Sequence, residues 1–157
     1  ECSEVARSFA LLADKEASFE YGYAFNAPYS INIETYGPGL ASSGVLAVGQ
    51  EDAYAWQRSL NSALAQGTRP HRRGMLRFVY PLNFLGTQLV DSPVKDESLA
   101  SWIKAHPSRG VLSKIGRNLW EWSIPGEEIS EIRRQLGALG KLVAHKAPQA
   151  KEKAKLP

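Results

Sequence analysis

The sequence predicts an α+β fold, with a mostly antiparallel sheet built from hairpins and about four helices packed on it. Apolar and polar residues alternate in paired segments, apolar residues recur at helical spacing in four others, and turn residues separate them. We expect one domain over residues 1–146, since 157 residues suffice for a single core. Residues 147–157, rich in lysine, alanine and proline, predict a disordered tail.

Two hairpins carry the period-two pattern. The first is predicted over residues 19–36, with its turn at Asn26-Ala27-Pro28. Its first strand should place four rings on one face of the sheet, as part of the core or, if no helix covers them, as an interface. These rings are Phe19, Tyr21, Tyr23 and Phe25. The second hairpin is predicted over residues 111–124, and further strands at 45–48, 75–80 and 82–90.

Four segments have helical spacing: 4–16, 51–66, 96–105 and 127–144. Ser3 is a suitable cap for the first helix, and Asp96 for the third. In the first helix Val5, Phe9 and Leu12 fall on one face. The longest apolar run is only a few residues, so no transmembrane segment is predicted in this chain.

Several chemistries lack their sequence signatures. The single cysteine, Cys2, excludes an internal disulfide and a thiolate metal cluster. The three histidines, His71, His106 and His145, do not have the close spacing of a metal-binding pair. The chain also lacks a nucleophile elbow and a phosphate-binding glycine loop. We therefore predict no catalytic residue, no metal site and no cofactor.

Charge is segregated along the chain although its formal net value is only +3. Residues 1–52 hold eight acids and two bases, whereas residues 53–117 hold ten bases and three acids. The bases crowd most densely in segment 69–77, which we call the basic loop. It contains Arg69, His71, Arg72, Arg73 and Arg77. Arginine clusters suit carboxylates and phosphates, so the basic loop is the predicted partner- or anion-binding site.

Two interpretations of the basic loop stay open. It binds a partner, with Tyr80, Trp120 and Trp122 as further aromatic contacts, or it is a solvated loop paired with the acidic N-terminal third. On the first interpretation we expect a non-enzymatic binding or assembly module, one domain of a larger bacterial-type protein, that engages an acidic protein surface. One alternative is a nucleic-acid-binding domain that adds the lysine tail to the same loop. Another is a soluble accessory domain of a membrane-linked enzyme.

Overall fold

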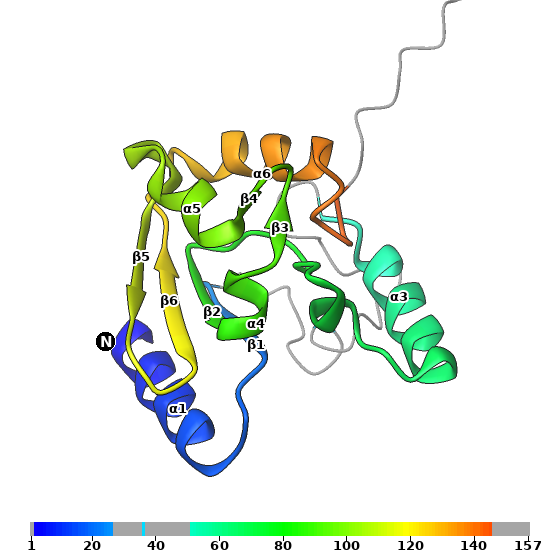
Figure 1. Ribbon diagram of the computed structural model, residues 1–157, viewed down its shortest axis with the longest axis horizontal. Helices are drawn as coiled ribbons and strands as arrows, with labels where there is room; N and C mark the ends of the chain where they lie inside the picture. The colour runs from blue at the N-terminus through cyan, green and yellow to red at the C-terminus, as the bar shows by residue number, and fades with distance from the viewer. Residues whose placement is uncertain (1, 27–35, 37–50, 146–157) are drawn as a thin grey trace, which may run out of the picture.

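The computed structural model describes residues 2–26, 36 and 51–145, and in these residues it confirms the α+β class. They contain five α-helices, a four-stranded antiparallel sheet and a separate two-stranded sheet (Figure 1). The strand order of the larger sheet is β1-β2-β6-β5. Its strands are β1 (Tyr21–Ala24), β2 (Leu82–Gly86), β5 (Val111–Lys114) and β6 (Leu119–Ser123). β5 and β6 form the predicted 111–124 hairpin.

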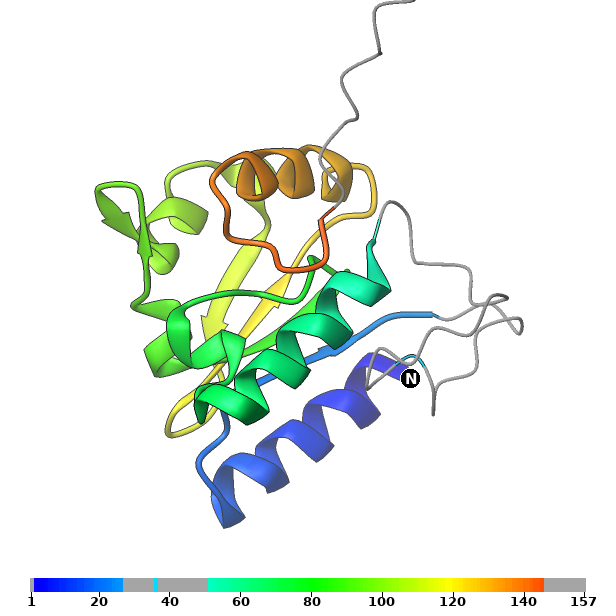
Figure 2. The same cartoon turned by 90° about the vertical axis from the view of Figure 1, so that its right-hand side faces the viewer.

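The two faces of the sheet carry different layers. Leu85, Trp122 and Leu112 point to one face, where they join the main core with α5 (Leu99–Lys104) and α6 (Ile129–Ala138). Phe84 and Leu119 point to the other face and meet the N-terminal helix α1 (Cys2–Glu16). Figure 2 shows α1 below the sheet and α6 above it. The remaining helices are α3 (Ala53–Gln66), α4 (Thr87–Val90) and two short 3-10 turns, η1 (Pro70–Arg73) and η2 (Pro107–Arg109).

The helix predicted over 4–16 forms, but its small residues face the sheet. Ala10 is buried beneath Phe84 and Leu119, and Arg7 reaches Glu121 on β6 with two hydrogen bonds of 2.6 and 2.7 Å. The large apolar residues point outward instead, with Val5, Phe9 and Leu12 exposed by 70%, 72% and 56%. The face of α1 that contains Ala6 and Ala10 therefore packs on the sheet, and these small side chains allow the helix to approach the sheet closely.

Three predicted boundaries need correction. The strand predicted over 75–80 is not a regular strand: residues 76–80 are buried, and Leu76 makes a single bridge to Leu142. The strand predicted over 82–90 ends at Gly86, and the chain then turns into α4. The third helix is capped by Ser98, whose hydroxyl accepts from the Ser101 amide; Asp96 lies in the turn between β3 (Pro93–Val94) and β4 (Glu97–Ser98).

The last helix ends at Ala138, earlier than predicted, because the chain folds back at Gly140 to meet Leu76 and Arg77. The second strand of the 19–36 hairpin, the strand at 45–48 and the tail lie outside the described residues. Within the part of the chain that the structure describes, no helix is both long and apolar enough to cross a bilayer.

Candidate functional site

The basic loop has a defined backbone conformation that packing and hydrogen bonds hold in place. Pro70 is buried and begins η1, and Gly74 ends it in the left-handed region (φ 75°), where its amide donates to the His71 carbonyl at 3.0 Å. A side chain at Gly74 would put its Cβ 2.7 Å from the Cβ of Ser92, so the position requires glycine. The Lys141 Nζ donates to the Gly74 carbonyl at 3.2 Å. The loop thus presents its arginines from a fixed backbone.

One carboxylate, Glu20, organises the outer side of the loop. It accepts from His71 Nε2 at 2.6 Å and from Arg72 Nε at 2.6 Å, and Arg69 lies 3.9 Å away. Burial works to raise the pKa of Glu20, but the hydrogen bonds from Arg72 and His71 outweigh it and hold that pKa below its ordinary value. A carboxylate can only accept, so His71 carries a proton on Nε2. Part of the loop therefore pairs with the acidic N-terminal third, as the second interpretation expected.

The arginines nevertheless keep much of their surface. Arg69 and Arg72 have side chains exposed by 67% and 52%. Arg73 is exposed as well and has no ion pair among the described residues. Three arginines against one carboxylate leave positive charge on this part of the surface.

Arg77 has a different place from the other members of the loop. It is completely buried, and its Nε donates to Glu51 Oε1 at 2.7 Å. Its Nη1 donates to the Tyr23 hydroxyl at 2.6 Å, and its Nη2 to the Tyr36 carbonyl at 2.9 Å. The guanidinium also lies 4.3 Å from the centre of the Tyr36 ring. Arg77 offers no surface to a partner and instead anchors the C-terminal end of the basic loop in the core.

Tyrosine side chains surround the buried Glu51–Arg77 ion pair. The hydroxyls of Tyr36 and Tyr80 both donate to Glu51, and the Tyr80 ring stacks on Tyr23 at 4.1 Å between centroids. Burial and the adjacent Glu51 charge raise the pKa of Tyr36 and Tyr80 above its usual range. Burial works to lower the pKa of Arg77, but Tyr80 and Glu51 outweigh it and the pKa rises. The guanidinium stays charged, and the phenols stay protonated as hydrogen-bond donors.

The predicted aromatic contacts are mostly interior. Tyr80 and Trp122 are fully buried, and the Trp122 indole donates to the Arg109 carbonyl at 2.6 Å. Trp120 is half-buried on the same face of the sheet. Of the four rings predicted on one face of the first strand, three pack against the main core, while Phe19 joins the cluster under α1. The structure therefore does not place Tyr80 or Trp122 on a surface beside the basic loop.

Two hollows flank the Glu20–His71–Arg72 group. The larger, about 790 Å³, is lined by the loop, by the end of α1 at Ala13 and Ala17, and by Leu60 of α3. The smaller, about 230 Å³, lies on the other side of the group, against α4 and Asn118. A separate pocket of about 580 Å³ lies at Phe25, Ile129 and Arg133, away from the loop. Arg72 thus borders both hollows, Arg69 borders the larger one, and Arg73 lines neither.

Sequence reasoning missed the acids that pair with the loop. Glu20 lies 51 residues before its partner His71, and Glu51 lies 26 residues before its partner Arg77. No spacing rule connects residues so far apart in the sequence. The charge segregation was the one available signal. In the described ranges, no three acids, histidines or cysteines gather closely enough to hold a metal ion.

No family model matches the chain, and neither a curated protein nor a solved structure does.

Proposed function

We propose that this protein is a non-enzymatic binding module that holds an acidic surface of a partner protein with Arg69, Arg72 and Arg73. The observation that carries the proposal is the arrangement around Glu20: the exposed Arg69 and Arg72 share this one carboxylate, and the exposed Arg73 has no ion pair among the described residues. Arginine binds carboxylates through paired N–H donors, so the remaining donors suit the acidic side chains of a partner.

The construction of the loop supports the same function. Pro70, Gly74 and the buried Arg77 fix its backbone before any partner arrives. A preorganised loop loses little conformational entropy on binding, which improves affinity without additional contacts. Charges at the edge of an interface also speed association, so we expect binding to weaken as salt concentration rises.

Nucleic acid is a less suitable partner for this site. Binding to single strands combines basic side chains with exposed aromatic rings on which bases stack. Tyr80 and Trp122, two of the three rings predicted for this purpose, are buried. The lysine tail lies outside the described residues and provides no structural support.

The test uses two anionic probes, a labelled octaglutamate peptide and a labelled single-stranded octathymidine, with fluorescence polarisation as the readout. The variant R69S/R73S removes two exposed charges and keeps Arg72, which holds Glu20. The control R58S/R134S removes the same charge from exposed positions on α3 and α6. We expect R69S/R73S to weaken peptide binding by about tenfold, and the control by about twofold or less.

Equal losses in the two variants would show that net charge alone attracts the peptide, and would overturn the proposal. Tighter binding of the oligonucleotide than of the peptide, with affinity falling steeply against the logarithm of salt concentration, would favour the nucleic-acid alternative.

A further inference from the structure

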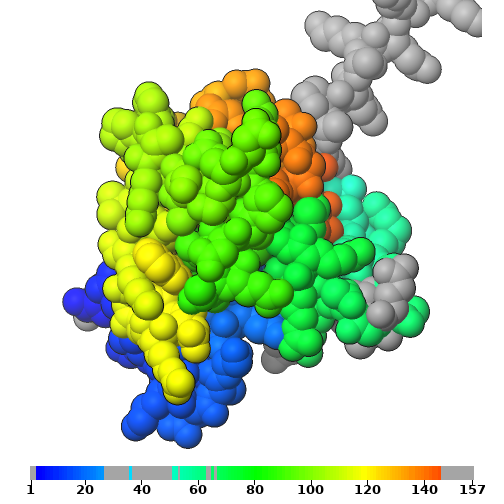
Figure 3. Space-filling view, in the orientation of Figure 1, coloured from blue at the N-terminus to red at the C-terminus, as the bar shows by residue number. Residues whose placement is uncertain are grey.

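The outer edge of β5 is a second surface with a defined chemistry, independent of the basic loop. β5 is the last strand in the order β1-β2-β6-β5. In Figures 1 and 3 the β5–β6 hairpin lies at the left of the molecule, above the N-terminal part of α1, with no described strand beyond it. The edge is therefore accessible to an incoming chain along Val111–Lys114.

The register shows which backbone groups face outward. The Ile115 amide donates to the Leu119 carbonyl at 3.0 Å, which makes these two residues a hydrogen-bonded pair. Antiparallel pairs alternate, so Ser113 and Val111 also direct their backbone groups toward β6. The amide and carbonyl of Leu112 and Lys114 then point away from the sheet. No hydrogen bond reaches them from the part of the chain that the structure describes.

Two lysines stand over one tryptophan beside this edge. The Nζ atoms of Lys104 and Lys114 lie 5.3 and 5.8 Å from the centre of the Trp120 ring. Both lysines are exposed, and neither has an acidic partner among the described residues. The indole N–H of Trp120 is buried without a hydrogen-bond partner there. Positive charge thus accumulates on this face of the edge, and no acid of the described residues pairs with it.

The opposite face of the same edge carries two small uncharged side chains, of which Val111 is apolar. Val111 is 62% exposed, and Ser113 next to it on that face is exposed too. Side chains of an added strand would alternate between the two faces. Side chains of the added strand on one face would contact Lys104 and Lys114, and those on the other face would contact Val111.

We propose that β5 binds an extended segment of a partner protein by strand addition, and that this segment alternates acidic and apolar side chains. The backbone groups of Leu112 and Lys114 supply the hydrogen bonds of the new ladder. Lys104 and Lys114 select carboxylates on one face, and Val111 takes an apolar side chain on the other. The same lysines oppose pairing with a second copy of this edge, since that would bring like charges together.

The experiment follows amide hydrogen exchange by NMR, with and without a five-residue peptide alternating valine and glutamate. The free protein should exchange the Leu112 and Lys114 amides quickly and the Val111 and Ser113 amides slowly. Saturating peptide should slow the first pair by about tenfold or more and leave the second pair unchanged. A peptide alternating valine and lysine is the matched control and should give no protection.

Two variants separate charge from backbone. Lys114→Ala removes one charge and keeps the outward amide, so it should weaken binding several-fold. Lys114→Pro also removes that amide, which faces solvent and is not part of the β6 ladder, so it should abolish protection at Leu112. Lys95→Asn removes the same charge from the β3–β4 turn and should bind as the parent does; asparagine suits the positive φ of 54° at that position.

Peptide binding without protection of Leu112 and Lys114 would overturn the proposal, as would equal binding of the glutamate and lysine peptides. Protection that appears without peptide as protein concentration rises would assign the edge to a second copy instead. If Lys114→Pro does not fold, Lys114→Ala and the two peptides decide the question alone.

Discussion

At the scale of single residues, the Glu51–Arg77 pair is the most consequential feature of the structure. Both side chains have no exposed surface, and their polar atoms are satisfied by their mutual ion pair, by the hydroxyls of Tyr23, Tyr36 and Tyr80, and by the Tyr36 carbonyl. A buried ion pair of this kind adds little beyond what apolar residues would provide, but it becomes costly when one partner is lost. It therefore fixes how segment 75–80 sits in the core.

We expect Arg77→Ala to lower the free energy of unfolding by about 3–5 kcal/mol, because Glu51 would remain buried without its counter-charge. Arg73→Ala, an exposed arginine four residues earlier, should change it by no more than about 0.5 kcal/mol. Urea unfolding at pH 7 gives both values. Similar losses in the two variants would contradict the distinction between anchor and surface within the basic loop.

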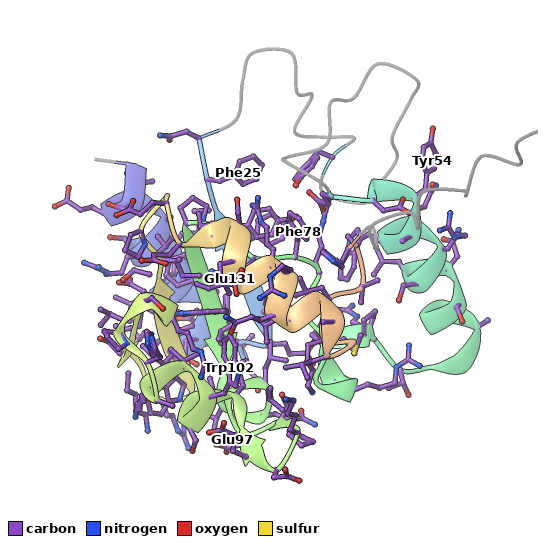
Figure 4. All side chains as sticks on the ribbon, turned by 90° about the horizontal axis from the view of Figure 1, so that it is seen from above. Phe25, Tyr54, Phe78, Glu97, Trp102 and Glu131 are labelled. Atoms are coloured by element: carbon purple, nitrogen blue, oxygen red, sulfur yellow. The ribbon has the colours of Figure 1, made fainter. Side chains whose placement is uncertain are left out.

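Loss of a buried tyrosine hydroxyl should lower stability more than loss of an exposed one. Tyr80→Phe removes a donor to the Glu51 carboxylate, and a hydrogen bond to a charged group contributes about 1.5–3 kcal/mol. Tyr54→Phe serves as the control, since Tyr54 is half exposed and points away from the body of the molecule in Figure 4. Urea unfolding should show a clear loss for the first variant and nearly none for the second. A fully stable Tyr80→Phe would mean that Arg77 and Tyr36 satisfy Glu51 without the Tyr80 hydroxyl.

At the scale of elements, α1 shows what periodicity can and cannot provide. The spacing of Val5, Phe9 and Leu12 correctly predicted a helix, because residues at i, i+4 and i+7 share one face of an α-helix. The spacing suggests that these three side chains face the core, yet the side of α1 with Ala6 and Ala10 packs on the sheet. Arg7 explains the choice, because only that side brings it to Glu121. A long-range ion pair has no local signature.

The orientation of α1 can be tested by two matched substitutions. Phe9→Gln replaces an exposed ring and should change the free energy of unfolding by no more than about 0.5 kcal/mol. Ala10→Gln puts a larger polar side chain against Phe84 and Leu119, and overpacking should cost about 1–3 kcal/mol. Thermal or urea unfolding checks both. The reverse order of effects would mean that the helix is turned by about half a revolution.

Other elements follow the same division between local and distant causes. The 111–124 hairpin was correctly predicted because its turn and its alternation lie within a few residues of each other. The strand predicted at 75–80 was wrong because the backbone groups of Leu76 and Arg77 bond to residues 141–144 instead of to a neighbouring strand of the sheet. In the candidate site, the arginines could be found from their crowding, whereas Glu20 and Glu51 could not.

At the scale of the whole molecule, the acidic N-terminal third and the basic middle are joined by ion pairs, so stability should depend on pH. The pKa of Glu20 is held below its ordinary value of 4.5 by Arg72 and His71, against the effect of burial. The hydrogen bonds to Arg134 and Gln135 lower the pKa of Glu131 to about 2. A carboxyl whose pKa is lower in the folded state stabilises the fold above its unfolded pKa. That contribution is lost as pH falls through the folded value.

Glu20→Gln isolates one of these contributions. At pH 7 the variant should be less stable than the parent, because glutamine is neutral and cannot pair with Arg72. As pH falls below 4.5 and then below the folded pKa of Glu20, the parent also becomes neutral at this position, so the two stabilities should converge. Glu97→Gln, at an exposed turn carboxylate labelled in Figure 4, is the control and should show no such convergence. Urea midpoints measured from pH 7 down to about pH 3 give the curves. A difference between parent and Glu20→Gln that stays constant over this range would mean that the basic loop holds Glu20 by shape and not by charge.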